Sequence, residues 1–265
     1  MKTDPNWLRL SSILVFLSAC AVEPTEGIED EPDTIDDVDD IPSPSDDLDA
    51  DSGWAEDTQS PDDSTDPEPA ETIAYNFDDS QSLLYVQVWK DEEAWGSGWA
   101  HDHVIRATDW EGSVLYNTDD LGQCALSFTV PVDDLIADES SMREYVGIEG
   151  TVSSSDRDTI KEHMLSSDQL NSDRYSEIEF NSTSCSSTSG GNGQIEIAGS
   201  LTLRGETKSI TATMDLNIQG GKLYLSGDLD ISATQFGFEP YSAYAGAVRN
   251  MDEMVIGLDL VGIAQ

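Results

Sequence analysis

The chain has 265 residues, 37% of them hydrophobic, and its 54 acidic and 12 basic side chains give a formal net charge of -42. Such an excess of negative charge repels phosphate backbones, so nucleic-acid binding is not expected. The sequence also contains no nucleophile elbow, no P-loop and no paired-histidine zinc helix. We therefore expect a binding or structural protein that is not an enzyme and needs no cofactor.

The first twenty residues, MKTDPNWLRLSSILVFLSAC, are typical of an export signal. Lys2 and Arg9 precede an apolar run of only about ten residues, whereas a spanning helix needs roughly twenty. The tetrapeptide LSAC, which ends at Cys20, resembles the bacterial lipobox, in which the cysteine is acylated and cleavage falls just before it. This predicts a lipoprotein signal peptide over residues 1–19. The alternative is an ordinary secretory signal with an incidental cysteine.

Lipid on Cys20 would attach the protein to a membrane of the bacterial cell envelope. Several acyl chains make a stable anchor, while a single chain binds only marginally. Ala21, rather than Asp, follows the cysteine. By resemblance to enterobacterial sorting rules, this favours the outer membrane, with the protein on its periplasmic or cell-surface face.

The next segment is an acidic linker. Between residues 21 and 71 there are 21 Asp or Glu among 51 residues, and no Lys or Arg. Such a stretch cannot bury enough apolar surface to offset the entropy of ordering, so we expect residues 20–71 to be a disordered acidic tether that begins at the lipidated cysteine. Random-coil scaling gives it an average span of roughly 40 Å. Calcium capture by its Asp clusters is an alternative, although no EF-hand spacing is present.

Residues 72–265, about 190 in number, suit one domain and carry alternating apolar and polar residues typical of half-buried strands. The glycine of Arg204-Gly205-Glu206-Thr207 favours a tight turn between two of these strands. Seven or eight strands with short connections predict an all-β, closed or nearly closed antiparallel barrel. The expected strands lie at 82–90, 104–116 (broken near Asp109), 125–132, from 178 onward, 195–203, 210–218, 223–231 and 254–263.

One segment predicts a short helix. Ser155 is a candidate N-cap with Asp158 three residues later, after which Ile160, Met164 and Leu165 fall on one face that packs on the barrel. The run of Gly and Ser between residues 182 and 193 is expected to be a loop.

Three cysteines fit an exported protein. With Cys20 assigned to lipid, Cys124 and Cys185 remain as an even pair in an oxidising compartment. A disulfide between them would close a loop of about sixty residues and contribute on the order of 4 kcal/mol to stability in the chain-entropy model. Two unpaired buried thiols are the alternative.

The stretch WGSGWAHDH combines aromatic and imidazole side chains. His101 and His103 have the spacing of two ligands on one strand face, but a zinc site usually needs three or four protein ligands, so no metal is expected. A role at the mouth of a cavity and a structural hydrogen-bonding role remain open. Trp95 and Trp99 either line that mouth or contact lipid headgroups with their amphipathic rings, with buried anchoring as the alternative.

Three segments in order resemble the YceI-like, lipocalin-type family of polyisoprenoid-binding proteins. They are RDTIKEHMLSSDQLNSDRYSEIEF (157–180), IEIAGSLTLRGETKSITATMDL (195–216) and ISATQFGFEPYSAYAGAVRNMDEMVIGLDL (231–260). The resemblance implies a lipocalin-like barrel of about eight strands around an elongated apolar cavity. It also implies a ligand such as a prenyl quinone or a prenyl phosphate.

The candidate ligand contacts come from the apolar faces of the expected strands, where plain core packing is the alternative for each of them. An eight-stranded barrel holds either a filled core or one slim ligand. The candidates are Phe128, Val130, Ile197, Leu201, Ile210, Met214, Leu216, Leu225 and Phe236.

The leading hypothesis is a lipid-anchored protein that holds a polyisoprenoid or similar apolar chain in its barrel for transport, storage or sensing. A second hypothesis is a structural or interaction lipoprotein whose barrel is filled by its own side chains and which acts through a protein partner. An enzyme acting on a lipid is the third and has the least support.

Overall fold

The computed structural model describes residues 70–189 and 193–265. The predicted signal peptide, Cys20 and the acidic linker up to residue 69 lie outside the described residues. In the part of the chain that is described, no helix has the length and apolar character needed to cross a membrane.

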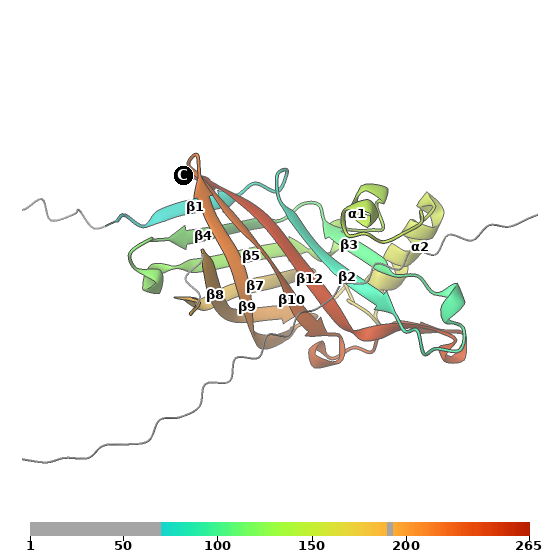
Figure 1. Ribbon diagram of the computed structural model, residues 1–265. Helices are drawn as coiled ribbons and strands as arrows, with labels where there is room; N and C mark the ends of the chain where they lie inside the picture. The colour runs from blue at the N-terminus through green and yellow to red at the C-terminus, as the bar shows by residue number, and fades with distance from the viewer. Residues whose placement is uncertain (1–69, 190–192) are drawn as a thin grey trace, which may run out of the picture. The chain divides into compact units, whose positions relative to one another are not determined.

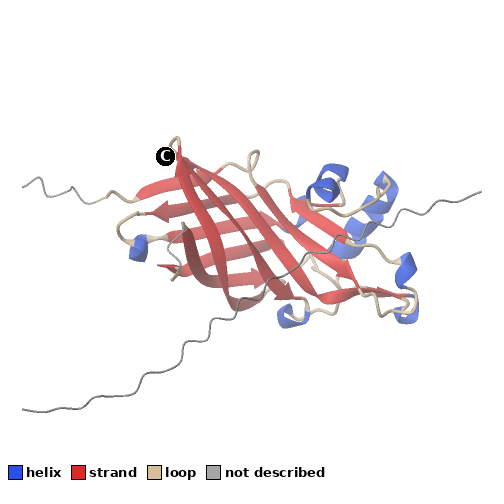
Figure 2. Ribbon diagram, viewed as in Figure 1, coloured by secondary structure: helices blue, strands red, loops and turns tan. Residues whose placement is uncertain are grey.

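The described residues form a closed antiparallel barrel of eight strands, as predicted (Figures 1 and 2). Neighbouring strands pair in the order β1-β4-β5-β7-β8-β9-β10-β12, and pairing of β12 with β1 closes the ring. The ring strands are β1 (Ile73–Phe77), β4 (Glu111–Tyr116), β5 (Ala125–Pro131), β7 (Glu177–Ser187), β8 (Gln194–Leu203), β9 (Glu206–Gln219), β10 (Lys222–Ser232) and β12 (Val248–Ala264).

The long strand β12 has two partners along one of its edges. Its last residues, Gly262–Ala264, pair with β1, while the stretch from Asn250 to Asp259 pairs with β2. Strands β3 and β6 continue the sheet beyond β2, and β11 pairs with the start of β12. The barrel wall is therefore built differently at its two ends. These additional strands are β2 (Leu83–Lys90), β3 (His103–Ala107), β6 (Leu135–Ala137) and β11 (Ser242–Ala243).

Two α-helices lie at the end of the barrel where β2, β3 and β6 replace β1, at the right in Figure 1. They are α1 (Ser140–Tyr145), which was not predicted, and α2 (Ser154–Leu165), which was. Helix α2 begins two residues earlier than the N-cap prediction, because Ser153 Oγ, not Ser155, accepts a hydrogen bond from the Asp156 backbone N–H. Helix α2 packs on β6 and α1 packs on β3.

The tight turn at residues 204–207 is confirmed in a shorter form. Only Arg204 and Gly205 form the turn, both with positive φ (53° and 75°), as a type I′ hairpin requires. The following two residues already belong to β9 and pair with β8. The Arg204 guanidinium donates to the backbone carbonyls of Ser167 and Gly237, which helps to hold the less favourable backbone conformation of a non-glycine residue.

The loop prediction over 182–193 was partly wrong, because β7 continues to Ser187 and pairs with β8 as far as Ile195. A bulge between Ser182 and Ser184 shifts the register there. Small polar residues are poor strand formers by themselves, so their strand conformation depends on tertiary contacts.

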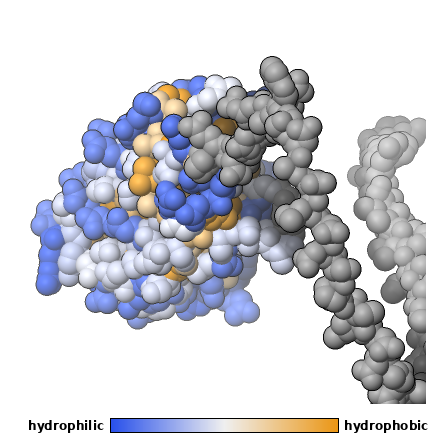
Figure 3. Space-filling model, turned by 90° about the vertical axis from the view of Figure 1, so that its left-hand side faces the viewer, coloured by the Kyte–Doolittle hydropathy of each residue, from blue (hydrophilic) through white to orange (hydrophobic). Residues whose placement is uncertain are grey.

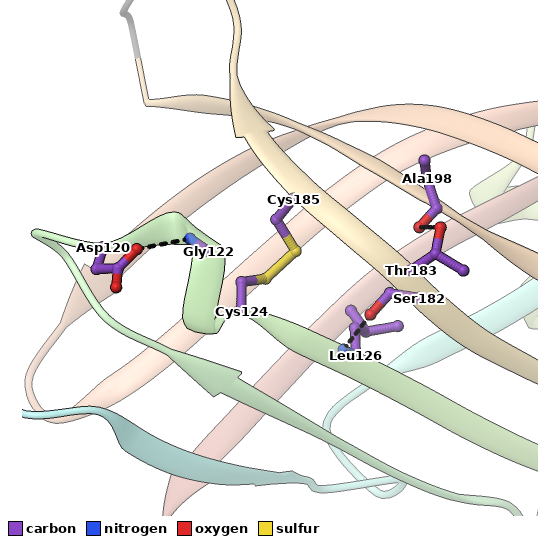
Figure 4. Close-up of a disulfide and its surroundings, with 8 residues drawn as sticks. All are labelled: Asp120, Gly122, Cys124, Leu126, Ser182, Thr183, Cys185 and Ala198. Carbon is purple, nitrogen blue, oxygen red and sulfur yellow. Dashed lines mark hydrogen bonds between the residues drawn. A yellow bond between two sulfur atoms is a disulfide. The ribbon is translucent and has the colours of Figure 1, made fainter.

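The predicted disulfide provides one of those contacts. Cys124 and Cys185 are joined in a bond with an S–S distance of 2.06 Å, and both are buried (Figure 4). Close to it, the Ser182 hydroxyl accepts a hydrogen bond from the Leu126 backbone N–H (2.7 Å), just beyond the point where the β5–β7 ladder ends. Together they fasten β7 to the start of β5.

Figure 3 views the barrel from the end that carries the disulfide. The described surface on this side is mainly hydrophilic, with hydrophobic residues gathered in a few small patches.

Candidate ligand-binding cavity

A cavity of about 220 Å³ lies at the helix-bearing end of the barrel. For comparison, an engineered apolar cavity of roughly 150 Å³ binds benzene, so this one has room for roughly ten non-hydrogen atoms. Its walls are mostly aliphatic and aromatic. The apolar lining comes from Leu84, Val86, Val88, Ile105, Ala107, Phe128, Val130, Leu135, Ile160, Met164, Leu170, Ile178, Leu201, Leu203, Ile231, Ala233, Phe238, Met254 and Ile256.

Strand alternation explains why these residues face inward. On β3, residues 103, 105 and 107 line the cavity, while Val104 and Arg106 point to the outer face. Val104 is fully buried because α1 packs on that face, and Arg106 forms an ion pair with Glu139 at 2.7 Å. The sheet thus directs apolar side chains inward on a strand that is covered on both sides.

Helix α2 supplies part of the cavity wall. Ile160 and Met164 line the cavity and are only half-buried, in contrast to the ring strands' core residues. The sequence predicted that this face packs on the barrel, which is confirmed. The helix therefore forms the part of the cavity wall next to β6, the strand on which it packs.

The cavity reaches the surface beside a small group of polar side chains. Met251 lines it and is 41% exposed. His163 stacks on Tyr241 with ring centroids 5.2 Å apart, and both contribute to the lining together with Gln169 and Asn250. A ligand's polar end can therefore meet water or these groups while its apolar part is enclosed.

One polar side chain lies at the wall itself. His103 Nδ1 is 2.7 Å from Asp138 Oδ2, and Asp138 is completely buried. The other carboxylate oxygen of Asp138 accepts from Arg143 Nη1 at 2.7 Å and from the Val104 backbone N–H at 3.2 Å. Arg143 is buried as well and donates to the backbone carbonyls of residues 102, 149 and 150. The buried charges are thus paired, and each guanidinium nitrogen and carboxylate oxygen has at least one hydrogen-bond partner.

The pKa of the Asp138 carboxyl lies below its ordinary value of 3.8. Burial by itself raises this pKa, but the hydrogen bond and charge of His103, followed by the hydrogen bond from Arg143, outweigh burial. Asp138 is therefore a carboxylate at neutral pH and accepts hydrogen bonds from its neighbours.

The opposite end of the barrel is nearly filled. Its interior has a cavity of only about 30 Å³, separated from the large one by Phe128, Leu201 and Ile256, which line both. Phe128 stacks on Phe180 with ring centroids 5.3 Å apart. The same barrel thus contains both arrangements that the sequence left open, a self-filled interior at one end and a cavity at the other.

The predicted ligand contacts divide between these two regions. Phe128, Val130 and Leu201 line the large cavity, and Ile197, Ile210, Met214 and Leu225 line the small one. Leu216 and Phe236 line neither. Leu216 packs against the core two residues beyond Met214, and Phe236 is completely buried in a 3₁₀ turn after β10.

The four residues predicted at the cavity mouth are also divided. Only His103 lines the cavity. His101 is exposed, and Trp95 and Trp99 are 71% and 67% exposed, with rings packed edge-to-face at 5.9 Å. Within residues 70–189 and 193–265, no group of three or more His, Cys, Asp or Glu is arranged to hold a metal ion.

A family model for the YceI-like domain matches residues 75–261, which is most of the chain and all of the barrel except the first residues of β1 and the last residues of β12. The chain belongs to the YceI-like family. No curated protein sequence matches this YceI-like chain.

Solved structures resemble this YceI-like domain in fold. Burkholderia cenocepacia BcnA is 16% identical with a TM-score of 0.53, and the match covers 70% of this chain and 98% of BcnA. A YceI protein of Campylobacter jejuni is 14% identical with a TM-score of 0.43, covering 61% of this chain and 84% of that one. At these identities the similarity to BcnA concerns the fold alone.

Sequence reasoning missed several groups of this YceI-like site. Asp138 and Arg143 are 35 and 40 positions from His103, and no motif distinguishes Asp138 from the many other acidic residues. Tyr241 lies between β10 and β12, and Asn250 lies near the start of β12, ahead of the strand expected at 254–263, so neither was marked by a strand pattern. The available signal for Asp138 was its position directly after the apolar triplet Leu135-Ile136-Ala137, which indicates a strand end.

Proposed function

We propose that this YceI-like protein is a lipid-anchored binding protein that holds a polyisoprenoid or similar apolar chain in its barrel, for transport, storage or sensing in the bacterial envelope. The observation that carries the proposal is the apolar cavity of about 220 Å³ beneath α2, which opens at a polar rim. Removing apolar ligand surface from water contributes about 25 cal/mol per Å², so such a site needs little directional chemistry.

The size of the cavity limits what it holds in this conformation. Ligand sites for drug-sized molecules occupy roughly 300–1,000 Å³, which is more than this cavity offers. A long prenyl quinone or prenyl phosphate would therefore place about two isoprene units inside. Displacement of the wall formed by Phe128, Leu201 and Ile256 would join the large cavity to the small one and admit more of the chain.

The test is native mass spectrometry with solvent extraction on the whole mature chain. The protein is exported behind a cleavable secretory signal with Cys20→Ser, so that no detergent competes for the cavity. An apolar species at one per chain is expected. A clean mass that stays unliganded after incubation with prenyl quinones and prenyl phosphates would instead favour the structural lipoprotein that acts through a protein partner.

A matched pair of variants ties the ligand to the cavity. Val86 faces the cavity from β2, and its neighbour Gln87 faces the outer side of the same strand. Val86→Trp should fill the cavity and abolish co-purification, whereas Gln87→Trp should leave the bound species unchanged. Equal retention by both variants would place the ligand elsewhere.

The anchor is tested separately. We propose that Cys20 carries the acyl chains, that the acidic segment to residue 71 is a tether, and that the protein resides at the outer membrane. Metabolic labelling with a fatty-acid analogue should mark the wild type and not Cys20→Ser, and fractionation should recover the label with the outer membrane. Label that persists in the variant would refute the anchor site.

A further inference from the structure

The wall of the large cavity contains a histidine whose ring is held from one side. His103 shares the inner face of β3 with Ile105 and Ala107, so its side chain points into the barrel. Nδ1 is engaged by Asp138 at 2.7 Å. The ring edge that remains for the cavity therefore carries Nε2. In the described part of the chain, no group forms a hydrogen bond with Nε2.

Asp138 determines which nitrogen carries the hydrogen. A carboxylate only accepts hydrogen bonds, so Nδ1 must be the protonated nitrogen that donates to it. In the neutral imidazole, Nε2 then has a free lone pair. Arg143 already balances the charge of Asp138, and most of the cavity lining is apolar.

Two features keep the ring in this orientation. Asp138 has a positive φ of 51° and exchanges backbone and side-chain hydrogen bonds with Val104, the residue next to His103. Arg143 holds the same carboxylate and three backbone carbonyls from a buried position. The acceptor is thus preorganised before any ligand arrives, and binding does not have to order it.

We propose that His103 Nε2 accepts a hydrogen bond from a hydroxyl group of the apolar ligand, so that the cavity selects chains bearing a hydroxyl, such as a prenyl alcohol or the reduced form of a prenyl quinone. This inference rests on the proposed function. An apolar ligand of the same length but without a hydrogen-bond donor would leave Nε2 unpaired in an apolar wall. Such a ligand therefore binds more weakly than one with a hydroxyl group.

The test uses two ligands that fit the cavity and differ in one hydrogen-bond donor. Geraniol has ten carbons and a hydroxyl, and geranyl methyl ether replaces the hydroxyl hydrogen by a methyl group. Calorimetric titration of the whole mature chain with Cys20→Ser should show roughly two- to tenfold tighter binding of geraniol, which is the range for one neutral hydrogen bond.

Two variants identify the acceptor. His103→Phe keeps a ring of similar size without a nitrogen, and Asp138 retains Arg143 and the Val104 N–H as partners. The preference for geraniol should disappear while the ether still binds. In Asp138→Asn, the amide can donate to Nδ1, which moves the imidazole hydrogen to Nε2. That variant should also lose the preference although His103 is present, and it serves as the test if His103→Phe does not fold.

The outcomes separate this inference from the proposed function. Binding of both ligands with equal affinity to the wild type would overturn the role of His103 and leave the apolar cavity as the binding site. A preference that persists in His103→Phe would likewise overturn it. Failure of both ligands to bind the wild type, together with an unliganded native mass, would overturn the proposed function and this inference with it.

Discussion

The two ends of the barrel use the same strands for different purposes. At the end that carries the disulfide, Leu225 and Leu260 are each 1% exposed, and a cavity of only about 30 Å³ remains. At the end that carries the helices, the lining residues Ile160, Met164 and Met254 are half-buried around about 220 Å³. Stability and ligand capacity are therefore located in separate halves of one β-barrel.

The difference arises from how each end is closed. The filled end is closed by backbone pairing of β12 with β1, which brings opposite walls together and lets their side chains interdigitate. At the other end β6 pairs with β3 alone among the described strands, and α2 covers the interior with side chains instead of a hydrogen-bonded strand. Because a helix covers this end in place of a paired strand, the interior keeps a cavity there, whereas strand pairing at the other end brings the walls close enough to fill it.

Removal of the disulfide should have the largest effect, because it fastens the filled end. Replacement of Cys124 and Cys185 by Ser should lower the free energy of unfolding by about 4 kcal/mol, since the bond spans 61 positions. Chemical denaturation, with Cys20→Ser in both proteins, measures the loss. A change below about 1 kcal/mol would mean that the filled end holds together without its covalent link.

A pair of truncations compares the ends directly. Leu225→Ala removes a completely enclosed side chain and should cost about 3 kcal/mol, whereas Ile160→Ala on α2 only enlarges an existing cavity and should cost about 1 kcal/mol or less. Ile160→Ala should instead weaken ligand binding. Equal destabilisation in urea would contradict the division of the barrel into a stabilising and a binding half.

Acid should weaken the helix-bearing end through Asp138. Its folded pKa is depressed below 3.8, so its contribution to stability is present above about pH 4 and is lost as the pH falls from 3.8 through the lower folded value. Compared with Asp138→Asn, the wild type should lose up to about 1.4 kcal/mol of unfolding free energy per pH unit in that range. If the unfolding free energies of the two proteins changed with pH in the same way, Asp138 would not have this role.

Tyr85, whose ring packs edge-to-face on Tyr145 with centroids 5.8 Å apart, should give the smallest effect. Burial, followed by the charges of Tyr145, Asp228 and Asp259, raises the pKa of Tyr85 to about 12. Its stabilising contribution is therefore present below pH 10 and lost as the pH rises towards 12. Ultraviolet titration should show one fewer late-ionising phenol in Tyr85→Phe, with a change in stability at pH 7 below about 1 kcal/mol. If Tyr85→Phe instead removed a phenol that ionises near pH 10, the raised pKa would not belong to Tyr85.

Much of the fold was predictable because alternation depends only on local sequence. The segments at 82–90, 195–203 and 223–231 became β2, β8 and β10 with shifts of one residue at the ends. The cysteine pair and the helix were also predicted correctly. In contrast, α1, β6 and the second half of β7 were missed, since their conformations are supported by packing and the disulfide and not by their own side-chain patterns.

The candidate site was less predictable than the barrel. Alternation identifies an inward face, but it does not distinguish Leu225, which is packed in the filled end, from Val130, which lines the cavity. That distinction depends on which strand or helix stands opposite. For the same reason, the exposed Trp95 and Trp99 could not be separated in advance from the cavity-facing His103.

The sequence alone determined that residues 72–265 form an antiparallel YceI-like barrel, because strand periodicity, turn residues and three ordered motifs are properties of local stretches of chain. The tertiary structure decided where the interior stays open and which histidine faces it. Those outcomes depend on pairings between distant residues, β12 with both β1 and β2 and Asp138 with His103 and Arg143, and no local pattern encodes the volume left between elements that meet only in the folded barrel.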